Sequence, residues 1–154
     1  MHAVSDTTAF DPSLDDGTRS IHLRIPAKAE YITLCRLALT GLAQLRDIRE
    51  ETMAELKLAL TEAVSNSVRH AYGEQGDGHV DITYRLAPDR LGIEVVDDGH
   101  GFDHEGGTSP ALEDDELSEG GLGIAIIRSI ADEFELQSTA GTRGSRLRFS
   151  KVLD

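Results

Sequence analysis

Residues 55–72, ELKLALTEAVSNSVRHAY, constrain the fold of this chain more than any other stretch. Their apolar side chains recur with the period of about 3.6 residues that a helix needs to pack one face against a core. Glu62 and Asn66 lie outside that apolar arc, four residues apart and therefore one above the other. A carboxylate beside a carboxamide can hold a divalent cation or accept a proton. The plain alternative is a solvated helix flank.

Shorter patterns predict the other elements of the fold. Helical spacing of apolar residues recurs in 27–47 and 122–131, and Thr52 with Glu55 fits a capping box that starts the long helix. Alternation of apolar and polar residues predicts strands at residues 20–25, 79–87, 91–96, 134–139 and 145–152. This order predicts an α+β fold, a two-layer sandwich with helices on one face of a mixed, mostly antiparallel sheet. We expect residues 20–25 to form an edge strand.

Length and composition are those of a single soluble domain. The chain has 154 residues, of which 39% are hydrophobic, and no run of about 18 apolar residues suggests a membrane span. Residues 1–19 lack the basic and apolar regions of a secretory signal, so we expect a disordered tail, one domain at 20–154 and a cytoplasmic location. Cys35, the only cysteine, is expected to be a buried structural thiol.

The charge distribution restricts the ligands this chain can bind. A net charge of −13 argues against binding to nucleic-acid phosphates, which requires clustered Lys and Arg. Residues 91–127 contain no Lys or Arg at all, although they contain many acids. A phosphorylated ligand bound there must therefore depend on a metal ion and on backbone amides.

A second motif, DDGHGF, follows the strand predicted at 91–96. Asp97 at a strand end can accept a hydrogen bond from an exocyclic amine, and Gly99 and Gly101 allow the backbone to approach a flat ring such as adenine. An acidic turn is the plain alternative, because Asp and Gly are common turn residues. The spacing does not match a calcium-binding loop.

A third motif, EGGLGI in residues 119–124, opens the helix predicted near the carboxyl end. Glycines at a helix start expose amide N–H groups at the positive end of the helix dipole, which is an anion site without any basic side chain. The motif is not a Rossmann turn, because no β-α-β unit surrounds it, and it lacks the Lys of a Walker loop. No histidine pair has zinc-ligand spacing with a third ligand, so a zinc enzyme is not expected.

In this order, the three motifs resemble the Bergerat-fold ATP-binding domain of the GHKL superfamily, which includes gyrase-type ATPases, histidine kinases and MutL. The chain is most similar to the RsbW-like and sporulation-type anti-sigma factors, which are serine-protein kinases. The resemblance covers about residues 20–152 and depends most on EAVSNSVRHAY, beginning at Glu62. It implies that Glu62 is the general base, that Asn66 binds Mg²⁺, and that Asp97 binds the adenine amine of ATP. The remaining residues that the resemblance assigns to nucleotide binding are Gly99, Gly101, Gly120, Gly121, Leu122, Gly123 and, in a supporting role, Ser145.

The resemblance also implies an activity and partners. We expect an ATP-dependent kinase that phosphorylates a STAS-domain anti-sigma antagonist and otherwise sequesters a sigma factor or similar regulator. Arg36 falls where sporulation-type relatives contact a partner, or it is an ordinary exposed Arg, and a homodimer through the first strand and helix is expected by analogy. Gly120 departs from the Ser or Thr common in relatives, and the acidic residues 113–119 offer no cation to the γ-phosphate.

Two other functions remain as alternatives. A nucleotide-gated sequestering protein with little kinase activity would have no need of a base such as Glu62. A histidine-kinase catalytic domain is disfavoured, because the first helix has no phosphoacceptor His.

Overall fold

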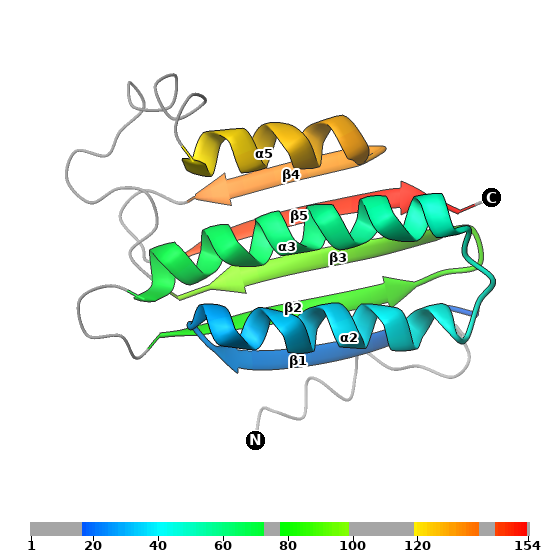
Figure 1. Cartoon of the computed structure of the whole chain (residues 1–154), viewed down its shortest axis with the longest axis horizontal. Helices are drawn as coiled ribbons and strands as arrows, with labels where there is room; N and C mark the ends of the chain where they lie inside the picture. Colours follow the sequence, from blue (N-terminus) through cyan, green and yellow to red (C-terminus); the bar gives the residue numbers. More distant parts are fainter. Residues whose placement is uncertain (1–16, 73–77, 99–118, 139–143, 154) are drawn as a thin grey trace.

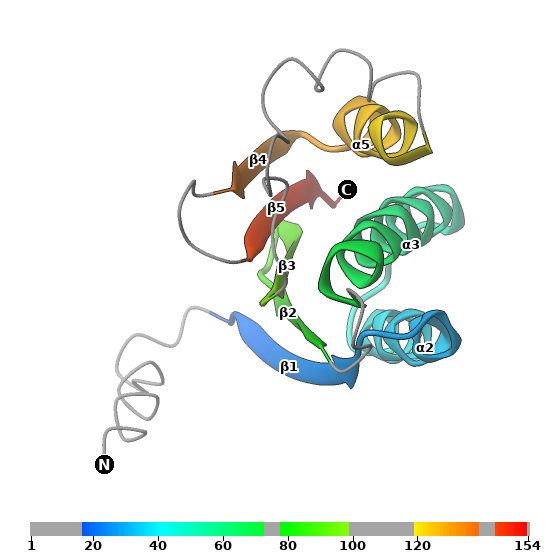
Figure 2. The same cartoon turned by 90° about the vertical axis from the view of Figure 1, so that its left-hand side faces the viewer.

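The computed structural model describes residues 17–72, 78–98, 119–138 and 144–153. Helices form one layer and a sheet forms the other, and all the labelled helices cover the same face of the sheet (Figures 1 and 2). In chain order the elements are β1 (Arg19–Pro26), the 3₁₀ turn η2 (Ala29–Tyr31), α2 (Ile32–Ala43), α3 (Glu50–Tyr72), β2 (His79–Leu86), β3 (Arg90–Asp97), α5 (Glu119–Ile130), β4 (Glu133–Ser138) and β5 (Ser145–Val152). The expected α+β sandwich is confirmed.

The sheet has the strand order β1-β2-β3-β5-β4. Each of these four pairings is antiparallel, so the described part of the sheet contains no parallel pair, although a mixed sheet was expected. Strand β1 lies at one edge, as predicted, and β4 lies at the other. Hairpin β2–β3 closes where the Ala87 amide donates to the Arg90 carbonyl at 2.9 Å.

The core lies between the sheet and the helices because alternate side chains of each strand face the helices. On β2 these are Val80, Ile82, Tyr84 and Leu86, all buried. Burial of one large aliphatic side chain contributes about 1.5–3 kcal/mol. The Tyr84 hydroxyl donates to the Cys35 carbonyl at 2.8 Å and so links the sheet to α2.

Cys35 is a buried free thiol, as predicted. Loss of hydration on burial raises its pKa from the ordinary 9.0 to about 11. The same cause, strengthened by the neighbouring Cys35, raises the pKa of Tyr84. Both groups are therefore neutral at physiological pH, and the thiol has a structural role.

Helix α2 is shorter than the predicted 27–47 and has apolar residues on two sides. Its inward side buries Cys35, Leu39 and Leu42. Leu34 and Leu37, which the sequence pattern assigned to the same apolar set, are 47% and 60% exposed. At the end of the helix the Gln44 amide donates to the Gly41 carbonyl and the Leu45 amide to the Leu42 carbonyl. These hydrogen bonds between residues three apart form a final turn of 3₁₀ type.

Helix α3 begins at Glu50, earlier than the predicted capping box allows. The Met53 amide donates to the Arg49 carbonyl at 2.9 Å, so the first helical turn is already complete before Glu55. Thr52 is 7% exposed and lies inside the helix, which makes the predicted capping box wrong. Although α3 has 23 residues, no helix in the described ranges is both long and apolar enough to cross a membrane.

Candidate functional site

Four elements end or begin at the same end of the molecule, on the left in Figure 1. They are the carboxyl end of α3, the end of β3, the start of β5 and the start of α5. Antiparallel pairing places Ser145, the first residue of β5, opposite Asp97, the last residue of β3. Helix α3 packs directly against α5 and also against β3. The fold therefore brings the described residues of the three sequence motifs to one end of the molecule.

Asp97 is buried at the end of the inward-facing row of β3, with 2% exposure. The Ser145 hydroxyl donates to Asp97 Oδ2 at 2.7 Å. Next to Ser145, Gly144 has φ +96°, and a Cβ atom there would meet the Asp97 carbonyl oxygen. The last strand thus approaches Asp97 through a glycine that no other residue could replace without strain. The contact places Ser145 beside Asp97, and its supporting role in nucleotide binding stays a prediction.

Asp98, the next residue, has a different environment from Asp97. Its side chain is exposed and accepts from the His79 amide at 3.4 Å, which holds the start of β2 to the end of β3. Of the two adjacent carboxylates, Asp97 therefore faces the helices and Asp98 supports the turn.

Glu62 lies against the start of α5. Gly123 is buried, and a Cβ atom on it would be 2.6 Å from Glu62 Oε1 and 3.6 Å from Glu62 Cδ. Only a glycine allows the carboxylate to lie this close to the α5 backbone. The half-buried Glu62 is thus held between two helices, and the alternative of a freely solvated helix flank does not describe it.

Asn66 is 6% exposed, so its carboxamide is also not a solvated surface group. Its Oδ1 accepts from Arg69 Nη2 at 3.2 Å. Arg69 brings a positive charge to this end of the molecule from outside residues 91–127, the segment that contains no Lys or Arg. The contact was missed, although the three-residue spacing on one helix could have indicated it.

The other predicted residues are placed less completely. Gly120 and Gly121 fall in the first turn of α5, at the positive end of the helix dipole, and Leu122 is 58% exposed beside them. Gly99 and Gly101 lie outside the described residues, as do most of the acidic residues 113–119. Arg36 is exposed on α2, a helix that lies on the opposite side of α3 from α5 (Figure 2).

Comparison with known proteins identifies the class that this fold and site define. A domain model described as a histidine kinase-like ATPase domain matches residues 25–151. The chain therefore belongs to the histidine kinase-like ATPase family.

Within that family, the chain is similar to several proteins named serine-protein kinase RsbW. It is 36% identical to that of Bacillus subtilis over 127 residues, which are 79% of each chain. It is 38% identical to that of Bacillus pumilus over 137 residues, 84% of this chain and 85% of the relative. The predicted resemblance to RsbW-like proteins is confirmed.

Two solved structures share the fold. A structure of RsbU and RsbW domains from Mycobacterium tuberculosis matches with a TM-score of 0.64 and 18% identity, over 88% of this chain and 32% of that longer chain. A chain of the SiaB–SiaC complex from Pseudomonas aeruginosa matches with a TM-score of 0.63 and 13% identity, over 97% of this chain and 99% of that one.

Proposed function

We propose that this chain is an ATP-dependent serine/threonine protein kinase of a cytoplasmic partner-switching system. Its substrate is a STAS-domain anti-sigma antagonist, and it sequesters a sigma factor or similar regulator in its other state. The similarity to RsbW serine-protein kinases supports the activity. The observation that carries the assignment of the site is the carboxylate of Glu62, held against the backbone of Gly123 at the glycine-rich start of α5.

Each placed residue has a defined part in this proposal. Asp97 accepts a hydrogen bond from the adenine amine, with Ser145 fixing the orientation of its carboxylate. Gly121 and Gly123 have no side chains to block the phosphates from the start of α5, the positive end of its dipole. Glu62 accepts the proton of the substrate hydroxyl while the phosphoryl group is transferred. Positioning of these groups supplies most of the rate enhancement.

A magnesium ion fits the donor chemistry of Asn66, because Mg²⁺ prefers oxygen ligands and keeps phosphates and waters for its other positions. When bound, the ion neutralises phosphate charge during transfer. Asn66 Oδ1 accepts from the Arg69 guanidinium. Two cations sharing one oxygen repel each other, so Arg69 must release Asn66 when a metal is held there.

The outer side of α2 supports the proposed partner contacts. Arg36 is exposed there and lies between the exposed Leu34 and Leu37 in the sequence. Arg is enriched at the energetic centres of protein interfaces, and exposed apolar side chains beside it add area that association would bury. At the neighbouring edge of the sheet, Ile21 of β1 is 40% exposed, and we assign this edge to the proposed homodimer.

The alternative is a nucleotide-gated sequestering protein with little kinase activity. The outer side of α2 would serve such a protein equally well, whereas a carboxylate held against Gly123 would have no task. Transfer of phosphate therefore distinguishes the two functions.

The test uses labelled ATP, Mg²⁺ and a STAS-domain antagonist. We expect transfer to a Ser or Thr of the antagonist by the wild type, loss of transfer with retained nucleotide binding in Glu62→Gln, and impaired Mg²⁺-dependent binding in Asn66→Ala. Glu55→Gln is a matched control on the same helix, because Glu55 pairs with Lys151 at 3.3 Å and takes no part in the site. Equal transfer by all four proteins would contradict the assigned roles.

A further inference from the structure

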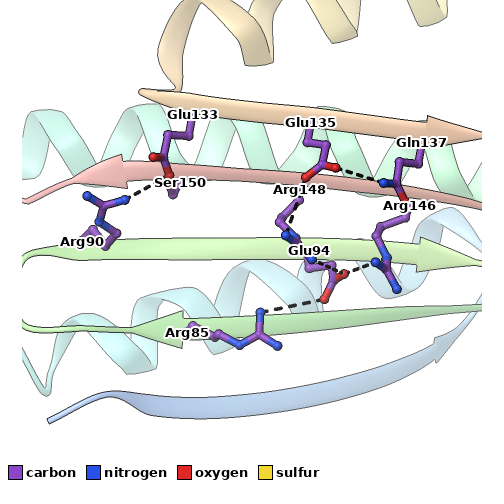
Figure 3. Close-up of polar contacts among 9 residues, drawn as sticks. All are labelled: Arg85, Arg90, Glu94, Glu133, Glu135, Gln137, Arg146, Arg148 and Ser150. Carbon is purple, nitrogen blue, oxygen red and sulfur yellow. Dashed lines mark hydrogen bonds and ion pairs between the residues drawn. The ribbon is translucent and has the colours of Figure 1, made fainter. Parts of the chain in front are cut away.

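The face of the sheet opposite the helices carries a hollow that the proposed kinase site does not use. Its volume is about 260 Å³, and we call it the outer hollow. Its lining includes Arg85, Glu133, Glu135, Arg148 and Ser150 (Figure 3), together with Gly92. Gly92 has no side chain and Ser150 a small one, and they pair across β3 and β5, which leaves the space open.

Arginines cluster around one glutamate beside this hollow. Glu94, whose side chain is 12% exposed, is approached by Arg146 at 3.0 Å, Arg148 at 3.7 Å and Arg85 at 3.9 Å. One carboxylate therefore faces three guanidinium groups from two flanking strands (Figure 3). When Arg90, Asp89, Glu133 and Glu135 are included, four arginines oppose four acids, because Arg90 pairs with both Asp89 and Glu133. The excess positive charge is therefore local: Arg85, Arg146 and Arg148 face Glu94 and Glu135, in a chain whose net charge is −13.

Residues 1–16 have the opposite charge. They contain Asp6, Asp11, Asp15 and Asp16 and no Lys or Arg, together with the large apolar residue Phe10. The acidic charge complements the arginines, and an aromatic side chain suits a hollow of this size.

The chain also enters the sheet next to the hollow. Gly17 lies beside the β2–β3 turn, since a Cβ atom on it would be 3.3 Å from the Pro88 ring. Ser20 pairs with Arg85, and Arg85 pairs with Gly92. Two strand spacings, about 10 Å, therefore separate Ser20 from Gly92. The ten residues from Phe10 to Ser20 can span about 33 Å, so Phe10 reaches the hollow easily.

We propose that the acidic segment 1–16 docks on the outer hollow of its own chain, with Phe10 in the hollow and its aspartates near the surrounding arginines. The proposal is independent of the kinase activity. Exposed ion pairs are weak, so the docking is an equilibrium that depends on salt. A short tether gives an effective concentration in the millimolar range, so an intrinsic dissociation constant of about 1 mM would leave about half of the segments docked.

The full chain with Phe10→Trp tests this proposal, because the wild type contains no Trp and the introduced indole is therefore a unique fluorophore. With half of the segments docked, the acrylamide quenching constant of this indole at low salt should be about half that of a peptide of residues 1–16 with the same substitution. It should rise to the peptide value in about 1 M NaCl, where charges are screened beyond about 3 Å.

Two further substitutions in the Phe10→Trp chain locate the contact. Gly92→Leu fills the hollow without strain, because a Cβ atom there has only ordinary contacts at 3.9 Å. Arg148→Gln removes one of the arginines. Each should raise quenching to the peptide value at low salt. The matched controls, Thr83→Leu and Arg24→Gln, change β2 and β1 outside the hollow and should leave the introduced indole protected.

Three outcomes would overturn the proposal. They are quenching of the introduced indole equal to that of the peptide at low salt, protection that survives both Gly92→Leu and Arg148→Gln, and protection that disappears on dilution, which would indicate contact between copies. Thermal unfolding of each variant verifies its fold. If Gly92→Leu or Arg148→Gln fails to fold, the salt comparison on the Phe10→Trp chain alone still tests the proposal.

Discussion

Replacement of Gly123 by alanine should affect the stability of the fold and the rate of phosphate transfer in opposite ways. In Gly123→Ala the added methyl group would be 2.6 Å from Glu62 Oε1, whereas an ordinary contact starts at 3.4 Å. The carboxylate must therefore retreat by about 0.8 Å, a movement open to the end of a flexible side chain. Alanine also favours a helix over glycine by about 1 kcal/mol. We expect the protein to remain folded, with stability unchanged or raised by up to this amount.

Catalysis should respond differently. A misplacement of about 1 Å in a catalytic group can lower the rate about 100-fold. This factor corresponds to about 2.7 kcal/mol of transition-state stabilisation. We therefore expect Gly123→Ala to lose most phosphate transfer to the antagonist while its melting temperature holds or rises by about 2–4 °C.

Labelled-phosphate transfer and thermal unfolding, measured on the same preparations, check this expectation. Gly41→Ala is the matched control, because Gly41 is also helical but a Cβ atom on it has no neighbour within 4 Å. It should gain similar stability and keep full transfer. Wild-type transfer by Gly123→Ala would refute the argument that Glu62 acts from its position beside α5, and a large fall in melting temperature would refute the argument that the carboxylate can retreat.

Three further predictions concern other groups. Ser145→Ala leaves the buried Asp97 carboxylate without one donor and should destabilise the fold by about 1–3 kcal/mol in thermal unfolding, whereas Ser145→Thr should retain most of that stability. Arg69→Gln replaces the hydrogen bond from the guanidinium to Asn66 Oδ1, which is worth about 0.5–1.5 kcal/mol, and so weakens the competition with the metal. The Mg²⁺ concentration for half-maximal transfer should therefore fall about threefold to tenfold. An unchanged Mg²⁺ requirement would contradict the competition. Stability should fall between pH 9 and about 11, because folded Cys35 keeps its proton in a range where the unfolded thiol loses it. Denaturant titrations across this range should give a shallower fall in Cys35→Ala, and equal slopes would contradict this cause.

The strands and the two-layer architecture were predictable because burial imposes a simple period. Each strand buries alternate side chains, so Val80 to Leu86 and Leu91 to Val95 show their inward faces directly in the sequence. The three motifs were predicted as one site only through the family resemblance. Pairing of β3 with β5 explains why Asp97 and Ser145 meet, a contact that depends on strand order and is not visible in either segment alone.

The errors have physical causes. Thr52 has the residue type of a cap, but it lies within a helix that starts two residues earlier, so local propensity was overridden by packing. Leu34 and Leu37 match the helical period of the apolar residues, yet periodicity does not distinguish a side facing the core from a side facing a partner. The arginines around Glu94 come from strands far apart in the sequence, and only the sheet register assembles them.

Helix α3 has a consequence for local fluctuations of the protein. It contacts α2, α5 and three strands, so it cannot unwind at Glu62 without opening most of the core. Regions that contact few neighbours open in small, independent steps, whereas a central element opens only with the whole domain. The amides of residues 59–66 should therefore exchange with solvent deuterium only through global unfolding. The proposed base and metal ligand would then remain aligned while the edge strands fray and reclose.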